Sequence, residues 1–186
     1  MAAGSLITST AATTIAVVRG VDDLDAPTPC AEFDVRALVE HLLTWGPALA
    51  GAGRGETVPP LEDVRVGDDW AERVEAQVAD IGAAWADDTA WEGTTHMGGP
   101  TEMPADLVGG MVLTELLVHG WDLGRASGQR PEWDDDVLEF ALDEVAKTAD
   151  QGRAMGVYGA EVVVPDGAST LDRVLGLTGR DPRWKP

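Results

Sequence analysis

The stretch Leu107–Ala126, LVGGMVLTELLVHGWDLGRA, places the strictest limit on how this chain can fold. It is apolar enough for the central helix of a globular domain, yet Glu115, His119 and Asp122 interrupt it at helical spacing. At ~100° per residue, Glu115 and His119 lie ~40° apart around the helix axis, and Asp122 falls within ~60° of both. Burying charged groups without partners is costly. These side chains must therefore be paired, hydrogen-bonded or bound to a metal ion.

Length, charge and cysteine content narrow the class of protein. The 186 residues suffice for one well-buried core and are few for two, so we expect a single domain over residues 1–186. The formal net charge of −20 argues against nucleic acid or an anionic membrane as partner, because both would repel it. The one cysteine, Cys30, excludes an internal disulfide and a multi-thiolate zinc site. The sequence has no basic leader and no uninterrupted apolar span, so we expect a cytoplasmic protein. We expect its partner to be a small-molecule substrate and the protein to be a monomer or a homodimer.

Apolar periodicity predicts an all-α fold with four long helices. The predicted helices span Leu6–Arg19, Asp34–Ala50, Asp68–Trp85 (with Asp68 or Asp69 as the N-cap) and Pro104–Gly128. Two long loops, Gly51–Gly67 and Asp87–Pro104, separate them, and the first predicts a crossover rather than a tight hairpin. A helix over Asp134–Ala149, an extended run at Val162–Val164 and a short helix capped by Ser169 and ended by Gly179 should pack outside the bundle.

Glu115 and His119 have the spacing that presents a carboxylate oxygen and an imidazole nitrogen one helical turn apart. Such a pair needs a third ligand, and His41 is the candidate because it lies on the core flank of another predicted long helix. Three protein ligands would leave a coordination position for water or substrate, which is the catalytic arrangement. The spacing alone leaves two alternatives open, a metal-free hydrogen-bonded pair and a partly exposed helix face.

Two segments resemble the signature stretches of the DinB-like metal-binding superfamily: TPCAEFDVRALVEHLL, residues 28–43, and LLVHGWDLGRASGQ, residues 116–129. They are most similar to the branch that resembles the N-terminal domain of mycothiol-dependent maleylpyruvate isomerase, and VPDGASTLDRVLGLTGRDP resembles the tail of small members. The resemblance implies a four-helix bundle with crossover connections that holds a divalent metal. Zinc is the expected ion, with nickel, iron or manganese as alternatives. The matching ligand positions are His41, Glu115 and His119; the superfamily often has histidine at position 115, whereas the isomerase branch has glutamate.

The resemblance also implies a chemistry. A bound dication favours a thiolate over a thiol, and members of the superfamily are thiol S-transferases or thiol-dependent isomerases. We therefore expect a metal-dependent enzyme that activates a small, mycothiol-like thiol for S-transfer or isomerisation. Because the chain is shorter than the isomerase, we expect it to be without that enzyme's additional C-terminal domain, and the resemblance does not extend to maleylpyruvate as the substrate. Two alternatives stay open: a non-catalytic metal-binding or ligand-sequestering protein, and a metal-dependent biosynthetic enzyme that uses no thiol.

Five further residues have two readings each. Asp122 is placed either to orient the His119 imidazole or to bond Arg125 or the backbone. Cys30 precedes a helix N-terminus, where a thiolate is favoured, but a buried structural cysteine is the ordinary case. His96 is either an exposed loop histidine or a residue at the mouth of the site. Trp45 and Trp121 either line the pocket or belong to the core.

Overall fold

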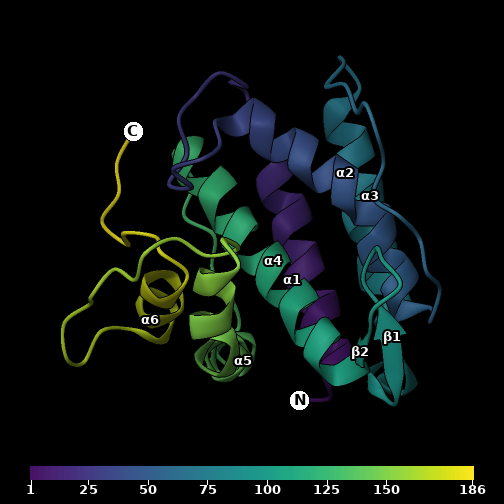
Figure 1. The fold of residues 1–186 in the computed structure, drawn as a ribbon. Helices are drawn as coiled ribbons and strands as arrows, with labels where there is room; N and C mark the ends of the chain where they lie inside the picture. The colour runs from purple at the N-terminus through teal and green to yellow at the C-terminus, as the bar shows by residue number, and fades with distance from the viewer.

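The computed structural model describes residues 1–186 and is predominantly helical (Figure 1). The elements in chain order are α1 (Ala3–Val18), α2 (Val35–Gly53), α3 (Trp70–Ala84), the 3₁₀ helix η1 (Asp88–Trp91), β1 (Thr94–His96), β2 (Glu102–Pro104), α4 (Ala105–Ala126), α5 (Asp135–Ala154) and α6 (Thr170–Leu177). The all-α prediction is confirmed. None of these helices is both long and apolar enough to cross a membrane.

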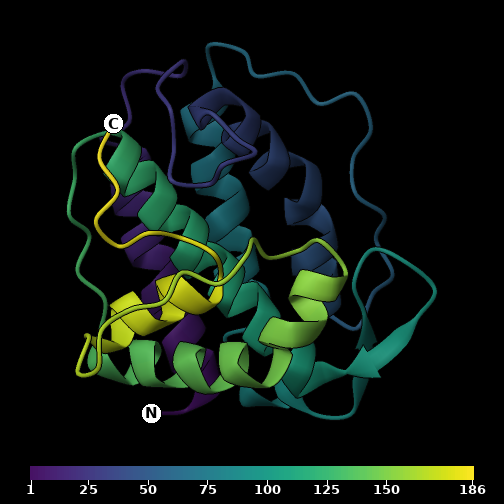
Figure 2. The same ribbon diagram turned by 60° about the vertical axis from the view of Figure 1, so that its left-hand side comes forward.

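Helices α1 to α4 form a four-helix bundle (Figure 1). Helices α1 and α2 are at opposite corners, and each packs against both α3 and α4. Helices α1 and α4 run in the same direction, since the Thr14 hydroxyl donates to the Leu116 carbonyl at 3.0 Å and Val17 packs near Gly124, further along both helices. Helix α5 lies across α4, and α6 packs on α5 outside the bundle (Figure 2). The predicted bundle with C-terminal additions is thus confirmed.

The loop between α2 and α3 is a crossover, as the sequence predicts. Gly46 packs near Gln77, and Gly53 packs near Trp85, so α2 and α3 run in parallel and the connection must return along the length of the bundle. Its course is visible at the edge of the molecule in Figure 2. The Leu61 amide donates to the Thr44 carbonyl at 2.9 Å and attaches this return to α2.

Helix α2 extends three residues beyond its predicted end at Ala50, through two glycines that have low intrinsic helix propensity. A Cβ on Gly53 would lie 2.8 Å from the Trp85 ring and 2.9 Å from the Ala84 carbonyl oxygen. Trp85 is fully buried, and its indole N–H donates to the Leu49 carbonyl at 2.9 Å. The close approach of α3 therefore stabilises a helical turn that propensity alone disfavours.

The segment Asp87–Pro104, predicted to be irregular, contains η1 and a short antiparallel hairpin. Thr94, Thr95 and His96 pair with Pro104, Met103 and Glu102. Three residues per strand are too few for apolar alternation to be recognised. Conversely, Val162–Val164 forms no strand, although the Val162 amide donates to the Gly176 carbonyl at 3.0 Å. At the other end of the chain, α5 continues to Ala154, five residues past its predicted end.

Helix α4 is the central element of the core. Most of its residues are buried, including Val108, Val112, Leu113, Leu116, Leu117 and Leu123. Its buried face also carries His119 and Asp122, which are 7% and 0% exposed, so the charged groups predicted to face inward do so. Glu115 lies at the edge of this face and is partly accessible to solvent.

Candidate metal centre

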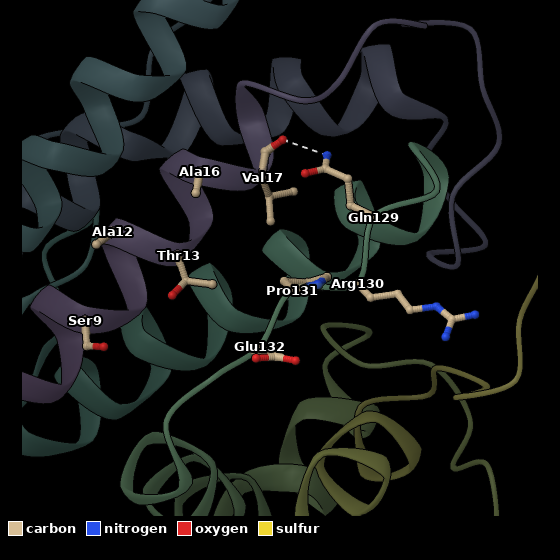
Figure 3. Close-up of a pocket in the computed structure, with 9 residues that line it drawn as sticks. All are labelled: Ser9, Ala12, Thr13, Ala16, Val17, Gln129, Arg130, Pro131 and Glu132. Atoms are coloured by element: carbon tan, nitrogen blue, oxygen red, sulfur yellow. Dashed lines mark hydrogen bonds between the residues drawn. The ribbon is translucent and has the colours of Figure 1, made fainter.

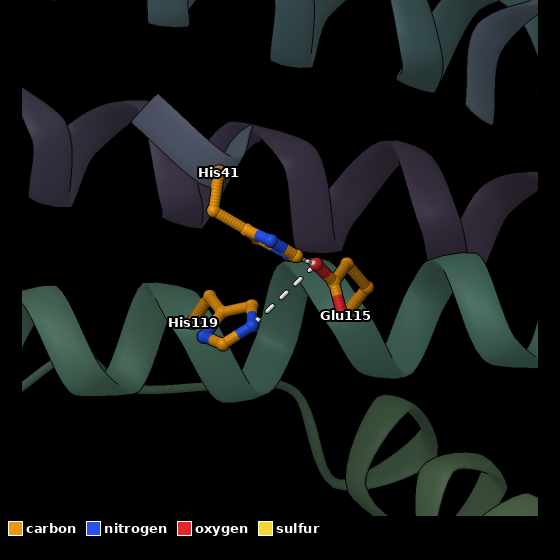
Figure 4. A group of neighbouring side chains, drawn as sticks. All are labelled: His41, Glu115 and His119. Atoms are coloured by element: carbon orange, nitrogen blue, oxygen red, sulfur yellow. Dashed lines mark hydrogen bonds and ion pairs between the residues drawn. The ribbon is translucent and has the colours of Figure 1, made fainter. Parts of the chain in front are cut away.

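The three predicted ligands come from two neighbouring helices of the bundle. The Asp34 carboxylate caps α2 by accepting from the Ala37 amide at 2.8 Å, and this start places His41 on the flank that faces α4. Glu115 and His119 lie one turn apart in the middle of α4 and point toward His41 (Figure 4). One donor atom from each of the three residues lies within 4.8 Å of the others.

The contacts converge on a single oxygen atom of Glu115. Nε2 of His41 lies 2.7 Å from Oε1, and Nε2 of His119 lies 3.5 Å from the same atom. Zinc binds histidine nitrogen and carboxylate oxygen at about 2.0–2.2 Å, so ligand atoms around one ion lie about 3–4 Å apart. The observed separations match this spacing within small side-chain movements. The donor set, two imidazoles and one carboxylate, is also one that zinc accepts.

The charge balance of the cluster favours a bound cation. Burial works against the Glu115 carboxylate, but the positive charge of His119 and the hydrogen bond from His41 outweigh it and lower the pKa of Glu115 from 4.5 to about 2. Burial also works against protonated His119, but Glu115 and then Asp122 outweigh it and raise the pKa of His119 above 6.5. Without a metal, a proton on the His119 imidazole supplies positive charge beside the carboxylates.

Asp122 lies behind His119 and contacts its other ring nitrogen. Nδ1 of His119 is 3.0 Å from Oδ2 of Asp122, and because a carboxylate only accepts, Nδ1 carries the proton. The same oxygen accepts a hydrogen bond from Nη2 of Arg180 at 3.1 Å. Asp122 thus orients the His119 imidazole, the first of its two readings, and it does not bond Arg125. Its buried partner Arg180 was not identified from the sequence.

One aromatic side chain borders the cluster, and a second is influenced by its charge. The Phe33 ring lies 5.2 Å from the His41 ring and 6.3 Å from the His119 ring, measured between centroids. Tyr158, in the segment after α5, is half-buried; burial raises its pKa above 10.0, and the nearby Glu115 carboxylate adds to this rise. The exposed side-chain fractions are 25% for His41 and 27% for Glu115, against 8% for His119. Solvent therefore reaches the cluster past His41 and Glu115.

The remaining candidate residues lie outside the cluster. Cys30 is half-buried, and burial raises the pKa of its thiol above 9.0, although the nearby Arg180 partly offsets this. His96 is in β1, and its Nδ1 is buried without a partner. Trp45 packs against the core near Gly98, and Trp121 is buried beneath the Arg125 guanidinium, 5.9 Å from the ring centroid. Both tryptophans contribute to packing.

A groove of about 490 Å³ lies elsewhere, between α1 and the segment that follows α4 (Figure 3). The Gln129 side chain donates to the Val17 carbonyl at 2.9 Å across its end. None of the three cluster residues lines it; its walls are Ser9, Ala12, Thr13, Ala16, Val17, Gln129, Arg130, Pro131 and Glu132. This groove is therefore not part of the candidate metal centre.

Comparison with known proteins identifies the family of this chain. Residues 7–124, well over half of the chain, match the family described as the mycothiol maleylpyruvate isomerase N-terminal domain. The chain belongs to this family. The matched segment covers α2 and α3 and most of α1 and α4, together with the three cluster residues, so the cluster lies in the part of the chain that the family shares. Arg180 and Tyr158 lie outside it.

Two relatives of this chain come from Mycobacterium tuberculosis. The uncharacterized proteins Rv0738 of strain H37Rv and MT0763 of strain CDC 1551 / Oshkosh are each 28% identical to it over 172 residues. The similarity covers 87% of this chain and 87% of each relative. It therefore extends past the family segment into the C-terminal additions. No solved structure matches the chain.

Proposed function

We propose that this chain binds one divalent metal ion through His41, Glu115 and His119 and uses it to activate a small thiol of the mycothiol type. The reaction is transfer of the thiol sulfur to a small electrophile or a thiol-dependent isomerisation, and zinc is the expected ion. A dication held by these three residues favours the thiolate form of a small thiol at neutral pH. Membership of the mycothiol maleylpyruvate isomerase N-terminal domain family supports the choice of thiol.

The observation that carries this proposal is the convergence of two imidazole nitrogens on one carboxylate oxygen, at 2.7 and 3.5 Å. Protons or a metal ion hold such a group together, because it combines a partly buried carboxylate with imidazoles that are neutral when they act as ligands. Asp122 adds a second buried carboxylate to the same region, which Arg180 balances. The His41, Glu115 and His119 group therefore retains a net demand for positive charge.

Glu115 acts in this proposal as an anionic ligand and not as a general base. Its pKa is held at about 2, so the carboxylate has little affinity for a proton at neutral pH. The Phe33 ring lies beside the two imidazoles, so it is placed to contact a substrate that approaches the exposed edges of His41 and Glu115.

The test is a thiol-conjugation assay with metal-stripped and zinc-reloaded protein. Mycothiol and a panel of small electrophiles are incubated with each form, and loss of free thiol and formation of the thioether are measured. We expect turnover that requires zinc and is lost in His119→Ala. His96→Ala is the matched control, because it removes a histidine outside the cluster and should retain turnover.

Two outcomes would contradict the proposal in different ways. Stoichiometric zinc binding that requires His119, without turnover of any electrophile, would favour the non-catalytic metal-binding protein. Absence of zinc binding by the wild-type protein would mean that the cluster is a metal-free hydrogen-bonded group.

A further inference from the structure

His119 is held from both sides of its ring. Its Nε2 faces Glu115 in the cluster, and its Nδ1 donates to Asp122 on the opposite side. A histidine that binds metal through Nε2 needs its proton on Nδ1, and an acceptor at Nδ1 selects that tautomer. Asp122 therefore determines whether the nitrogen that faces the cluster has a free lone pair.

Asp122 is itself held by a residue 58 positions away. Arg180 donates to its Oδ2 through Nη2 at 3.1 Å, and Nη1 of the same guanidinium donates to the Thr178 carbonyl at 2.8 Å. Asp122 is 0% exposed and Arg180 is 6% exposed. Burial disfavours the charged guanidinium, but the adjacent Asp122 carboxylate outweighs burial and raises the pKa of Arg180 above its ordinary value. Arg180 is thus the cationic partner that pairs with this buried carboxylate.

The backbone around Arg180 has little freedom. Gly179, the preceding residue, has φ = 84°, a left-handed conformation that favours glycine, and a Cβ there would lie 2.7 Å from the Gly159 Cα atom. After Arg180, the Trp184 carbonyl accepts a hydrogen bond from Nη2 of Arg125 on α4 at 2.6 Å. The turn that carries Arg180 is thus attached to the fold on both sides.

We infer that Arg180 is a positioning residue of the metal centre. It holds the Asp122 side chain in place, Asp122 accepts from Nδ1 of His119 and so orients the ring, and Nε2 is left free to bind the ion. The C-terminal segment, which lies outside the family-matched residues 7–124, thereby contributes to the metal site without supplying a ligand. This inference rests on the proposed function, because it assigns Arg180 a role in binding the same ion.

The test compares zinc affinity across four proteins: wild type, Asp122→Asn, Arg180→Met and the double variant. Affinity is measured by competition with a chromogenic chelator. We expect each single substitution to weaken zinc binding roughly 10- to 100-fold, which is typical of groups that support a ligating histidine. The double variant should be no weaker than the weaker single variant, because Arg180 acts through Asp122.

Three further variants separate positioning from general stability. Arg125→Met removes another contact between an arginine and the C-terminal segment but leaves Asp122 paired, so it should keep wild-type affinity. Arg180→Lys keeps a positive charge with a less suitable geometry, so its zinc affinity should lie between those of Arg180→Met and wild type. This variant also keeps the test decisive if Arg180→Met does not fold. His119→Ala should abolish binding.

A spectroscopic measurement reports on the imidazole directly. In zinc-loaded protein labelled with ¹⁵N-histidine, the Nδ1–H proton of His119 should give a strongly downfield ¹H resonance because it donates to a carboxylate. Arg180→Met and Asp122→Asn should each shift this resonance upfield, whereas Arg125→Met should not. An unchanged resonance in Arg180→Met, or a loss of affinity from Arg180→Met that is equally large in the Asp122→Asn background, would overturn the inference.

The failure of this inference is distinguishable from failure of the proposed function. If wild-type protein binds zinc through His119 and Arg180→Met binds it equally well, the inference fails and the metal site stands. If wild-type protein binds no zinc, both fail.

Discussion

The clearest prediction concerns the thermal stability that a metal ion adds to this protein and its loss in His119→Ala. A ligand that binds only the folded state stabilises it by RT ln(1 + [L]/Kd), which is about 2.7 kcal/mol when the free ion is at about 100 times its Kd. For a chain of 186 residues, the unfolding entropy is about 0.4 kcal/mol/K, so the melting temperature should rise by about 7 °C.

His119→Ala removes one of three donor atoms and leaves the His41 and Glu115 pair, whose atoms are 2.7 Å apart. Loss of a direct ligand should weaken binding by at least the roughly 100-fold upper limit for supporting groups. At the same free-ion concentration the stabilisation then falls to about 0.4 kcal/mol, which is about 1 °C. The shift on adding zinc is compared within each variant, so any change in the stability of the metal-free protein cancels.

The assay is a melting curve followed by circular dichroism, with protein stripped by chelator and free zinc fixed by a buffering ligand. His96→Ala is the control: it makes the same substitution at a histidine outside the cluster and should retain the increase of about 7 °C. A full shift in His119→Ala would refute the assignment of this residue as a ligand. An equal loss of the shift in His96→Ala would show that zinc binds elsewhere or that the effect is not specific to the cluster.

Three other predictions test the surrounding structure. Burial raises the pKa of the Cys30 thiol while Arg180 opposes the rise. Alkylation by iodoacetamide should therefore have a pH midpoint above that of a free cysteine peptide measured alongside, and the midpoint should move higher still in Arg180→Met. A midpoint at or below that of the free peptide would contradict the described burial. Gly53→Ala places a Cβ within 2.9 Å of Trp85 and Ala84, so it should lower the free energy of unfolding in urea by about 1–3 kcal/mol. Gly55→Ala tests backbone strain alone, because φ is 71° at Gly55 but no atom lies within 4 Å of an added Cβ. Equal effects of the two substitutions would remove the packing argument. Ser169 caps α6 by accepting a hydrogen bond from the Asp172 amide at 3.1 Å. Ser169→Ala should therefore lower the free energy of unfolding by about 1 kcal/mol, and Ser169→Asp should largely preserve it. An unchanged free energy of unfolding in Ser169→Ala would mean that the cap adds nothing to stability.

Local patterns in the sequence predict a large part of this fold. The apolar stripes and the caps at Asp34 and Ser169 depend on residues that are near one another in the chain, and the structure places helices there. The i,i+4 spacing of Glu115 and His119 fixes their relation on α4 for the same reason. His41 required more than periodicity, because periodicity places it on a core flank but does not say which helix it faces.

The tertiary structure decided the features that depend on distant segments. Helix α2 reaches Gly53 because Trp85, directly after α3, packs against it. The hairpin at 94–104 has strands too short for a periodic pattern. The Glu115 carboxylate raises the pKa of Tyr158 although the two residues lie far apart in the chain. Such contacts arise from packing, which no local pattern encodes.

The sequence by itself therefore determined that charged groups on Leu107–Ala126 face the core and that two of them share one helical turn. Only the tertiary structure decided how their charge is satisfied. His41 approaches Glu115 from α2, and Arg180 reaches Asp122 from a turn near the end of the chain. The physical reason is that a buried charge is stabilised by whichever partner packing brings within a few ångströms. That partner can lie anywhere in the chain, and the residues near the charge do not show where.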